Sequence, residues 1–173
     1  MAINRLASVL LLLLVTACAG CNTRGTGSTE SLTSARAAAV DHGVRAFMAT
    51  VAHDVTQEGP LAWSRHFEGG PSFFMAVNGQ MAFPTGAAAK EGIQNVALTL
   101  KQIDLKWGDD LRTDPLSPEL AMVATPWHEI KTDAAGHTTE DRGFFTGLAE
   151  YREGRWQFRD AHWSSTLAPA PAD

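Results

Sequence analysis

The sequence has very little cysteine, the residue that cross-links many small exported domains. Only Cys18 and Cys21 occur among its 173 residues, and both precede the part of the chain with a folded composition. That part therefore has no disulfide, no thiolate metal site and no cysteine nucleophile. Apolar residues make up 45% of the chain and charged residues 19%. This is a globular composition, and a domain of this length can bury a core without cross-links.

Several functional motifs are also missing. The histidines form no His-x-His or His-x-x-x-His pair and no HExxH motif, and the sequence has no phosphate-binding loop and no Gly-x-Ser-x-Gly elbow. Basic residues number 14 against 19 acidic ones, for a net charge of −5 without a basic stripe. We therefore expect no metal, no cofactor and no nucleic-acid partner. The six histidines are His42, His53, His66, His128, His137 and His162.

The first residues have the pattern of an export signal. Arg5 supplies a positive charge, and an unbroken apolar run covers Leu10–Val15, which is too short to span a bilayer but suits a signal-peptide core. The run ends in Val-Thr-Ala-Cys at positions 15–18, which resembles the bacterial lipobox with Cys18 as the lipid-bearing residue. Cys21 is a weaker acceptor, and a plain secretory signal cut near Ala17 is the alternative.

The lipobox resemblance implies a cellular location for the protein as well as a lipid anchor. Several acyl chains on Cys18 and the new amino terminus would hold it stably to a membrane. The acceptor is followed by Ala19 rather than by aspartate, which resembles outer-membrane sorting in Gram-negative cells. We expect an exported, lipid-anchored protein at the periplasmic face of the outer membrane.

The rest of the chain divides by composition. We predict a signal peptide over 1–17, a lipidated Cys and flexible tether over 18–33, one domain over 34–167 and a Pro/Ala tail over 168–173. The tether is rich in Gly, Ser and Thr and has no apolar periodicity.

The first half of the domain has helical periodicity. Apolar residues at three-and-four spacing predict a helix that Thr33 or Ser34 caps and Gly59-Pro60 ends, with a short second helix from Pro60 toward Phe67. Asn78-Gly79 predicts a tight hairpin between two short strands. A further helix is expected over about 87–100.

The second half has period-two alternation and predicts an antiparallel meander. The expected strands are 103–107, about 120–131, about 138–152 and 155–164, the last two joined by Glu153-Gly154. Helices first and strands afterwards indicate an α+β domain with the helices on one face of an antiparallel sheet.

Short phrases in the domain resemble a known superfamily. Asp141–Phe145 (DRGFF), Gly154–Trp156 (GRW) and Arg159–Ser165 (RDAHWSS) are similar to the closing hairpin of the SnoaL-like branch of the NTF2-like superfamily, near the DUF4440 group. Asn78-Gly79 and Gly86–Ile93 are similar to its early hairpin and helix entry. The resemblance implies an NTF2-like cone, a curved antiparallel sheet wrapped around three N-terminal helices. It also implies a pocket in the cone and a homodimer through the outer sheet face.

The last strand offers candidate catalytic groups. Alternation predicts that Asp160 and His162 share a face with Trp156, Phe158 and Ser164. If that face lines the cone, the carboxylate of Asp160 can orient His162 and raise its basicity, as a general base requires. The alternative is a pair that only completes hydrogen bonds at the rim or at a dimer interface.

Other residues are candidates for binding. His66, with Trp63 on the preceding turn, is expected near the pocket mouth, and Trp107, Trp127 and Trp163 are candidate aromatic walls, with Phe144 a further binding residue. Core packing or a surface position is the alternative for each of them. His128 and Glu129 are adjacent on a strand, so their side chains point to opposite faces.

Two enzyme types of the superfamily can be compared with the chain. A ketosteroid-isomerase-like site requires a tyrosine donor, and the only tyrosine is Tyr151, near a turn. An epoxide-hydrolase-like Asp-Arg-Asp set could use Asp141, Arg142 and Asp160, but adjacent strand residues face opposite ways.

Three functions remain open from the sequence. The first is a binding domain that takes a small apolar or aromatic molecule into the cone. The second is an enzyme of proton transfer, isomerisation or hydration that uses Asp160 and His162. The third is a non-catalytic homodimeric interaction domain whose cone is only core.

Overall fold

The computed structural model describes residues 32–166. The predicted signal peptide, nearly all of the tether with Cys18 and Cys21, and the Pro/Ala tail lie outside the described residues. Within the described range, none of the helices combines the length and the apolar character that a membrane crossing requires.

Helix α1 (Ser34–Glu58) begins and ends as the sequence predicts. The Thr33 side chain accepts a hydrogen bond from the backbone N–H of Arg36 at 3.3 Å, which caps the first turn. Gly59 ends the helix with φ at +79°, a conformation that glycine adopts without strain, and Pro60 opens the 3-10 helix η1 (Pro60–Arg65). The buried face of α1 consists of Val40, Val44, Phe47, Met48, Val51 and Val55.

A hairpin and a second helix follow. Strands β1 (Phe74–Val77) and β2 (Gln80–Phe83) are joined by Asn78-Gly79, both at positive φ, as a tight hairpin turn requires. Helix α2 (Gly86–Thr99) is capped by the Thr85 side chain, which accepts from the N–H of Ala88 at 3.2 Å.

The remaining strands complete a curved, unclosed, seven-stranded sheet in the order β2-β1-β7-β6-β5-β3, with β4 also paired to β5. They are β3 (Leu100–Trp107), β4 (Arg112–Ser117), β5 (Leu120–Asp133), β6 (Thr138–Arg152) and β7 (Arg155–Ser165).

Two features of this sheet correct the sequence prediction. Strand β4 was not expected, because Pro115 interrupts its pattern; proline is tolerated here at the edge of the sheet. The sheet is also mixed rather than wholly antiparallel, because β1 pairs with β7 in parallel. The α+β cone itself is confirmed.

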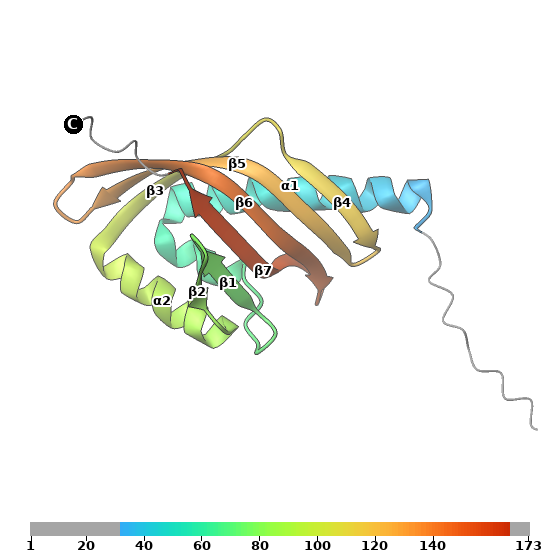
Figure 1. The fold of residues 1–173 in the computed structure, drawn as a ribbon, viewed down its shortest axis with the longest axis horizontal. Coiled ribbons are helices and arrows are strands. Elements are labelled where there is room, and N and C mark those ends of the chain that lie inside the picture. Colours follow the sequence, from blue (N-terminus) through green and yellow to red (C-terminus); the bar gives the residue numbers. More distant parts are fainter. Residues whose placement is uncertain (1–31, 167–173) are drawn as a thin grey trace, which may run out of the picture. The chain divides into compact units, whose positions relative to one another are not determined.

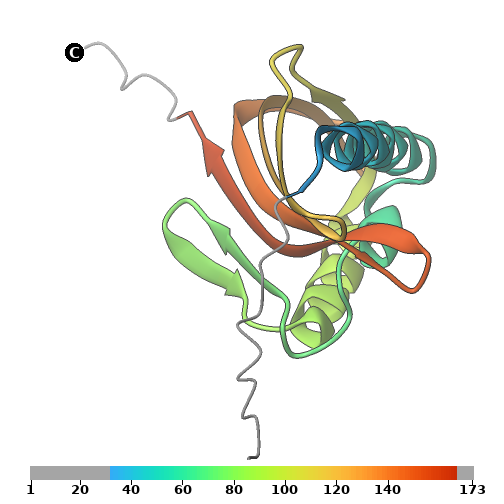
Figure 2. The ribbon, with the colours of Figure 1, turned by 90° about the vertical axis from the view of Figure 1, so that its right-hand side faces the viewer.

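Figures 1 and 2 show how the layers are arranged: α1 lies along the concave side of the sheet, and α2 lies beside η1 near the β1–β2 hairpin. An aromatic chain fills the interior next to α1. Phe158 packs against Phe47 at 4.8 Å and against Phe145 at 5.1 Å, and Phe145 packs against Trp163 at 4.8 Å between ring centroids. The part of the cone between α2, η1 and the sheet is not filled in this way.

Candidate functional site

A cavity of about 310 Å³ lies in that unfilled part of the cone. Side chains from η1, α2 and six strands line it. Its apolar wall includes Pro60, Trp63 and Phe67 from η1 and the turn after it, Met75, Val77 and Phe83 from the hairpin, and Ile93, Val96, Leu100 and Ile103 from α2 and β3, with Trp127 and Trp163 from β5 and β7. Ligand pockets have this character, with mostly apolar walls and a few polar groups.

Three tryptophans form a connected group in this wall. The ring of Trp163 meets Trp63 edge-on at 5.5 Å and Trp127 edge-on at 5.2 Å between centroids. All three are less than 10% exposed. Edge-to-face packing of this kind is favourable beyond the area it buries, so the wall is held in place without a ligand.

One end of the cavity is polar, and the strand register explains why. On β5, odd-numbered residues from Ala121 to Lys131 face the interior, so Glu129 and Lys131 follow Trp127 on the same face. Asp141 on β6 stands directly opposite Glu129, and Leu105 on β3 flanks it on the other side.

Within this polar end the charges are unevenly matched. The Lys131 ammonium forms an ion pair with the Asp141 carboxylate. Glu129 receives no hydrogen bond from the described residues. It is partly exposed toward the cavity, but protein atoms surround most of its carboxyl group. Burial raises the pKa of Glu129 to about 7, with Asp141 adding to the rise and Lys131 and His128 opposing it.

Solved structures share the fold of this domain. A nuclear transport factor 2 (NTF2-like) superfamily protein from Salmonella enterica serovar Typhimurium matches 79% of this chain and 97% of its own, at a TM-score of 0.65 and 12% identity. This domain has the NTF2-like fold.

Two further NTF2-like neighbours are named as enzymes. A protein from Novosphingobium aromaticivorans, provisionally named a scytalone dehydratase, has a TM-score of 0.63 and 12% identity over 75% of this chain and 86% of its own. A hexachlorocyclohexane dehydrochlorinase (LinA, type 2) has a TM-score of 0.59 and 12% identity over 77% and 92%. At these identities the likeness concerns the fold alone. No protein-family model and no curated protein matches the sequence.

The predicted catalytic pair lies on the outer face of the NTF2-like cone. The pairing of β6 with β7 has a bulge, where Leu148 opposes Asp160 but Ala149 opposes Phe158. The extra residue, Arg159, reverses the alternation, so that Ala161 and Trp163 point inward. The expectation that Asp160 and His162 share the inner face with Phe158 is therefore wrong, and their acid–base role stays an untested prediction.

Asp160 has a structural role at this bulge. Its Oδ1 accepts a hydrogen bond from the backbone N–H of Leu148 at 3.2 Å, a donor that the irregular register leaves free. Burial raises the pKa of Asp160, and this hydrogen bond opposes the rise. His162, two residues on, is exposed.

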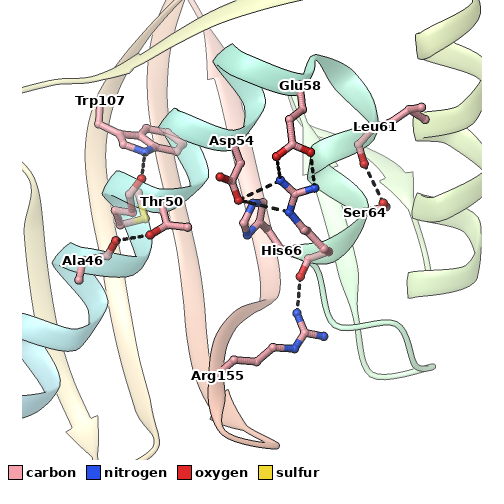
Figure 3. Close-up of polar contacts among 11 residues, drawn as sticks. Ala46, Thr50, Asp54, Glu58, Leu61, Ser64, His66, Trp107 and Arg155 are labelled. Atoms are coloured by element: carbon pink, nitrogen blue, oxygen red, sulfur yellow. Dashed lines mark hydrogen bonds and ion pairs between the residues drawn. The ribbon is translucent and has the colours of Figure 1, made fainter.

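His66 is buried, but beside α1 rather than at the cavity. Figure 3 shows His66 directed toward Asp54 on α1, where His66 Nε2 lies 3.1 Å from Asp54 Oδ2, an ion-pair distance without hydrogen-bond geometry. Arg65 forms an ion pair with the same Asp54 oxygen at 3.0 Å. Arg65 also pairs with Glu58, and Arg155 donates to the Arg65 carbonyl oxygen. Burial, helped by the charges of Arg65 and Arg155, lowers the pKa of His66 although Asp54 opposes the change. The expected place of His66 at the pocket mouth is corrected.

The remaining predicted binding residues divide between the two faces. Trp63 and Trp127 line the cavity, whereas Trp107 packs behind it and donates its indole N–H to the Met48 carbonyl oxygen at 2.8 Å. Phe144 lies on the outer face and is 45% exposed. It alternates with the inward Phe145, which explains the difference.

The geometry of the described residues favours neither a metal site nor either of the two enzyme types. No group of three His, Cys, Asp or Glu side chains within residues 32–166 is placed to hold a metal ion. In the Asp-Arg-Asp set, only Asp141 reaches the cavity, while Arg142 is exposed and Asp160 faces outward. Tyr151 is exposed at the end of β6, away from the NTF2-like cavity.

A second hollow lies at the end of β3 and β5, beside Trp107, Pro126 and His128. Its rim consists of exposed charged side chains such as Lys106 and Arg142, so it lacks the enclosed aromatic wall of the first.

Proposed function

We propose that this chain is an exported lipoprotein whose NTF2-like cone binds a small apolar or aromatic molecule. The cavity with its tryptophan wall is the observation on which the proposal depends. Its volume is near the lower end of the range of small-molecule pockets, which favours a compact ligand over a drug-sized one. An apolar molecule gains free energy there because it leaves water without breaking protein contacts.

A proton-transfer enzyme is the second candidate. Glu129 favours it, because a carboxyl group with a pKa near 7 in an apolar cavity suits a general acid or base at neutral pH. Two of the neighbours are named for eliminations, a dehydration and a dehydrochlorination, in which a base must take a proton. In such an enzyme Glu129 would take the place that the sequence suggested for Asp160 and His162.

The binding proposal can be tested on the chain without its lipid, residues 19–173. Indole, naphthalene and 2-phenylethanol should raise its melting temperature by mass action and change its tryptophan fluorescence. Ser165→Phe would fill the cavity from β7 and abolish the response, because Ser165 lines it. Ser164→Phe, one residue earlier on the opposite face, should leave the response unchanged. Equal responses of the two variants would contradict the proposal.

We also propose that the mature chain is anchored to the membrane through Cys18. The lipobox at positions 15–18 supports this proposal. Labelled palmitate fed to expressing cells should enter the wild type and a Cys21→Ser variant but not Cys18→Ser. Label that persists in Cys18→Ser would refute the anchor site.

The outer sheet face supports a further proposal, that two copies of the chain pair there. Met122, Phe144 and Phe74 are each more than 40% exposed. Met122, Leu148 and Phe74 share one row across β5, β6 and β1, in which Asp160 on β7 separates Leu148 from Phe74, and Phe144 lies four residues from Leu148 along β6. Exposed large apolar side chains gathered on one face of a sheet are typical of an interface.

A further inference from the structure

The polar end of the cavity has an unbalanced set of charges. Glu129 and Asp141 supply two carboxyl groups, and Lys131 supplies one ammonium, which pairs with Asp141. The Lys131 charge is thus already neutralised by a partner. When Glu129 is ionised, the three groups together carry one negative charge, located on the carboxylate without a partner.

Neighbouring elements add no compensating charge on the cavity side. Leu105 faces Glu129 from β3, and Ser165, also in the cavity lining, is neutral. His128 is adjacent on β5 but points to the opposite face, where its Nε2 lies 2.9 Å from Glu140 Oε1. A carboxylate in such surroundings is stabilised by a cation or by a hydrogen-bond donor brought in with a ligand.

The apolar wall favours the same kind of ligand. Trp63, Trp127 and Trp163 line the cavity together, and the electron-rich faces of aromatic rings attract cations. Aromatic walls combined with a carboxylate are the physical means by which proteins hold organic ammonium groups. An organic anion would instead meet like charges from Glu129 and Asp141.

We propose that the cavity selects a small organic cation, an amine attached to an aromatic or apolar body, with its ammonium group on Glu129. The inference rests on the proposed binding function and names its ligand class. The apolar body lies against the tryptophan wall, and the ammonium group neutralises the carboxylate that the folded chain leaves unmatched. A neutral molecule of the same shape leaves Glu129 without a partner and binds more weakly.

The test compares three probes of similar size: phenethylamine, 2-phenylethanol and phenylacetate. Binding to residues 19–173 is measured by calorimetry and by tryptophan fluorescence at pH 8. We expect phenethylamine to bind the wild type at least about tenfold more tightly than 2-phenylethanol, because a charge-assisted hydrogen bond is stronger than a neutral one. Phenylacetate should bind most weakly. Amine affinity should also rise between about pH 6 and pH 8, as Glu129 ionises.

Two variants separate Glu129 from the general charge of the protein. Glu129→Gln keeps the shape and should remove the preference for the amine, so that phenethylamine and 2-phenylethanol bind the variant with similar affinity. Glu140→Gln makes the same charge change on the outer face and should have no effect. If 2-phenylethanol or phenylacetate binds the wild type as tightly as the amine, the cation inference is wrong and the binding function stands. If none of the probes binds, the proposed function itself fails.

Discussion

The unmatched carboxyl of Glu129 should make the stability of this protein depend on pH in a measurable way. Its pKa is raised from an ordinary value of 4.5 to about 7 in the folded chain. Between these values the folded chain keeps a proton that the unfolded chain releases. The free energy of unfolding therefore falls as pH rises through this range, by roughly 3 kcal/mol in total, and then levels off.

Glu129→Gln removes this term, because glutamine keeps the size but does not ionise. Near pH 4.5 the variant and the wild type should have similar stability. Above about pH 8 the variant should be more stable by about 2 to 3 kcal/mol, a rise in melting temperature of about 6 to 10 °C.

The measurement is urea unfolding followed by circular dichroism at several pH values between these limits. Other carboxyl groups also titrate, so the informative quantity is the difference between variant and wild type at each pH. Glu91→Gln on the exposed side of α2 makes the same chemical change as a control and should give a difference near zero. A Glu129→Gln difference that does not change with pH would refute the reasoning that burial raises this pKa.

Three further predictions concern the sheet. Asp160→Ala should lower the free energy of unfolding by about 1 to 2 kcal/mol relative to Asp160→Asn, because asparagine keeps the acceptor for the Leu148 N–H. Neither variant should affect ligand binding. Equal stability of the two variants would contradict a structural role for this side chain. Glu153→Asn should stabilise the chain by about 1 kcal/mol in thermal or urea unfolding, because Glu153 has φ at +55° in a tight turn where asparagine is less strained. Phe144→Glu should convert a dimer into a monomer in size-exclusion chromatography with light scattering, and a wild type that is already monomeric would end the dimer proposal.

Much of the fold was determined by local sequence patterns. The apolar spacing of α1 and its Thr33 cap define a helix whatever its surroundings, and Asn78-Gly79 specifies its hairpin through backbone conformation alone. Strand β4 escaped prediction because its pairing with β5, rather than its own residues, makes Arg112–Ser117 a strand.

The polar end of the cavity depended more on tertiary structure than the helices and strands did. Alternation along β5 could have linked Glu129 and Lys131 to the buried Trp127, since all three are spaced by two. The position of Asp141 beside Glu129 and Lys131 depends on the register between β5 and β6, which is not apparent in the sequence of either strand.

Strand β7 separates what the local sequence determines from what the tertiary structure decides. Its residues determine that it is a strand, but a single bulged residue, Arg159, decides which side chains face the cavity. A bulge arises from how two strands fit together, and one extra residue exchanges inner and outer faces for everything after it. Asp160 and His162, which alternation placed on the inner face, therefore point outward, and Trp163 and Ser165 line the cavity instead.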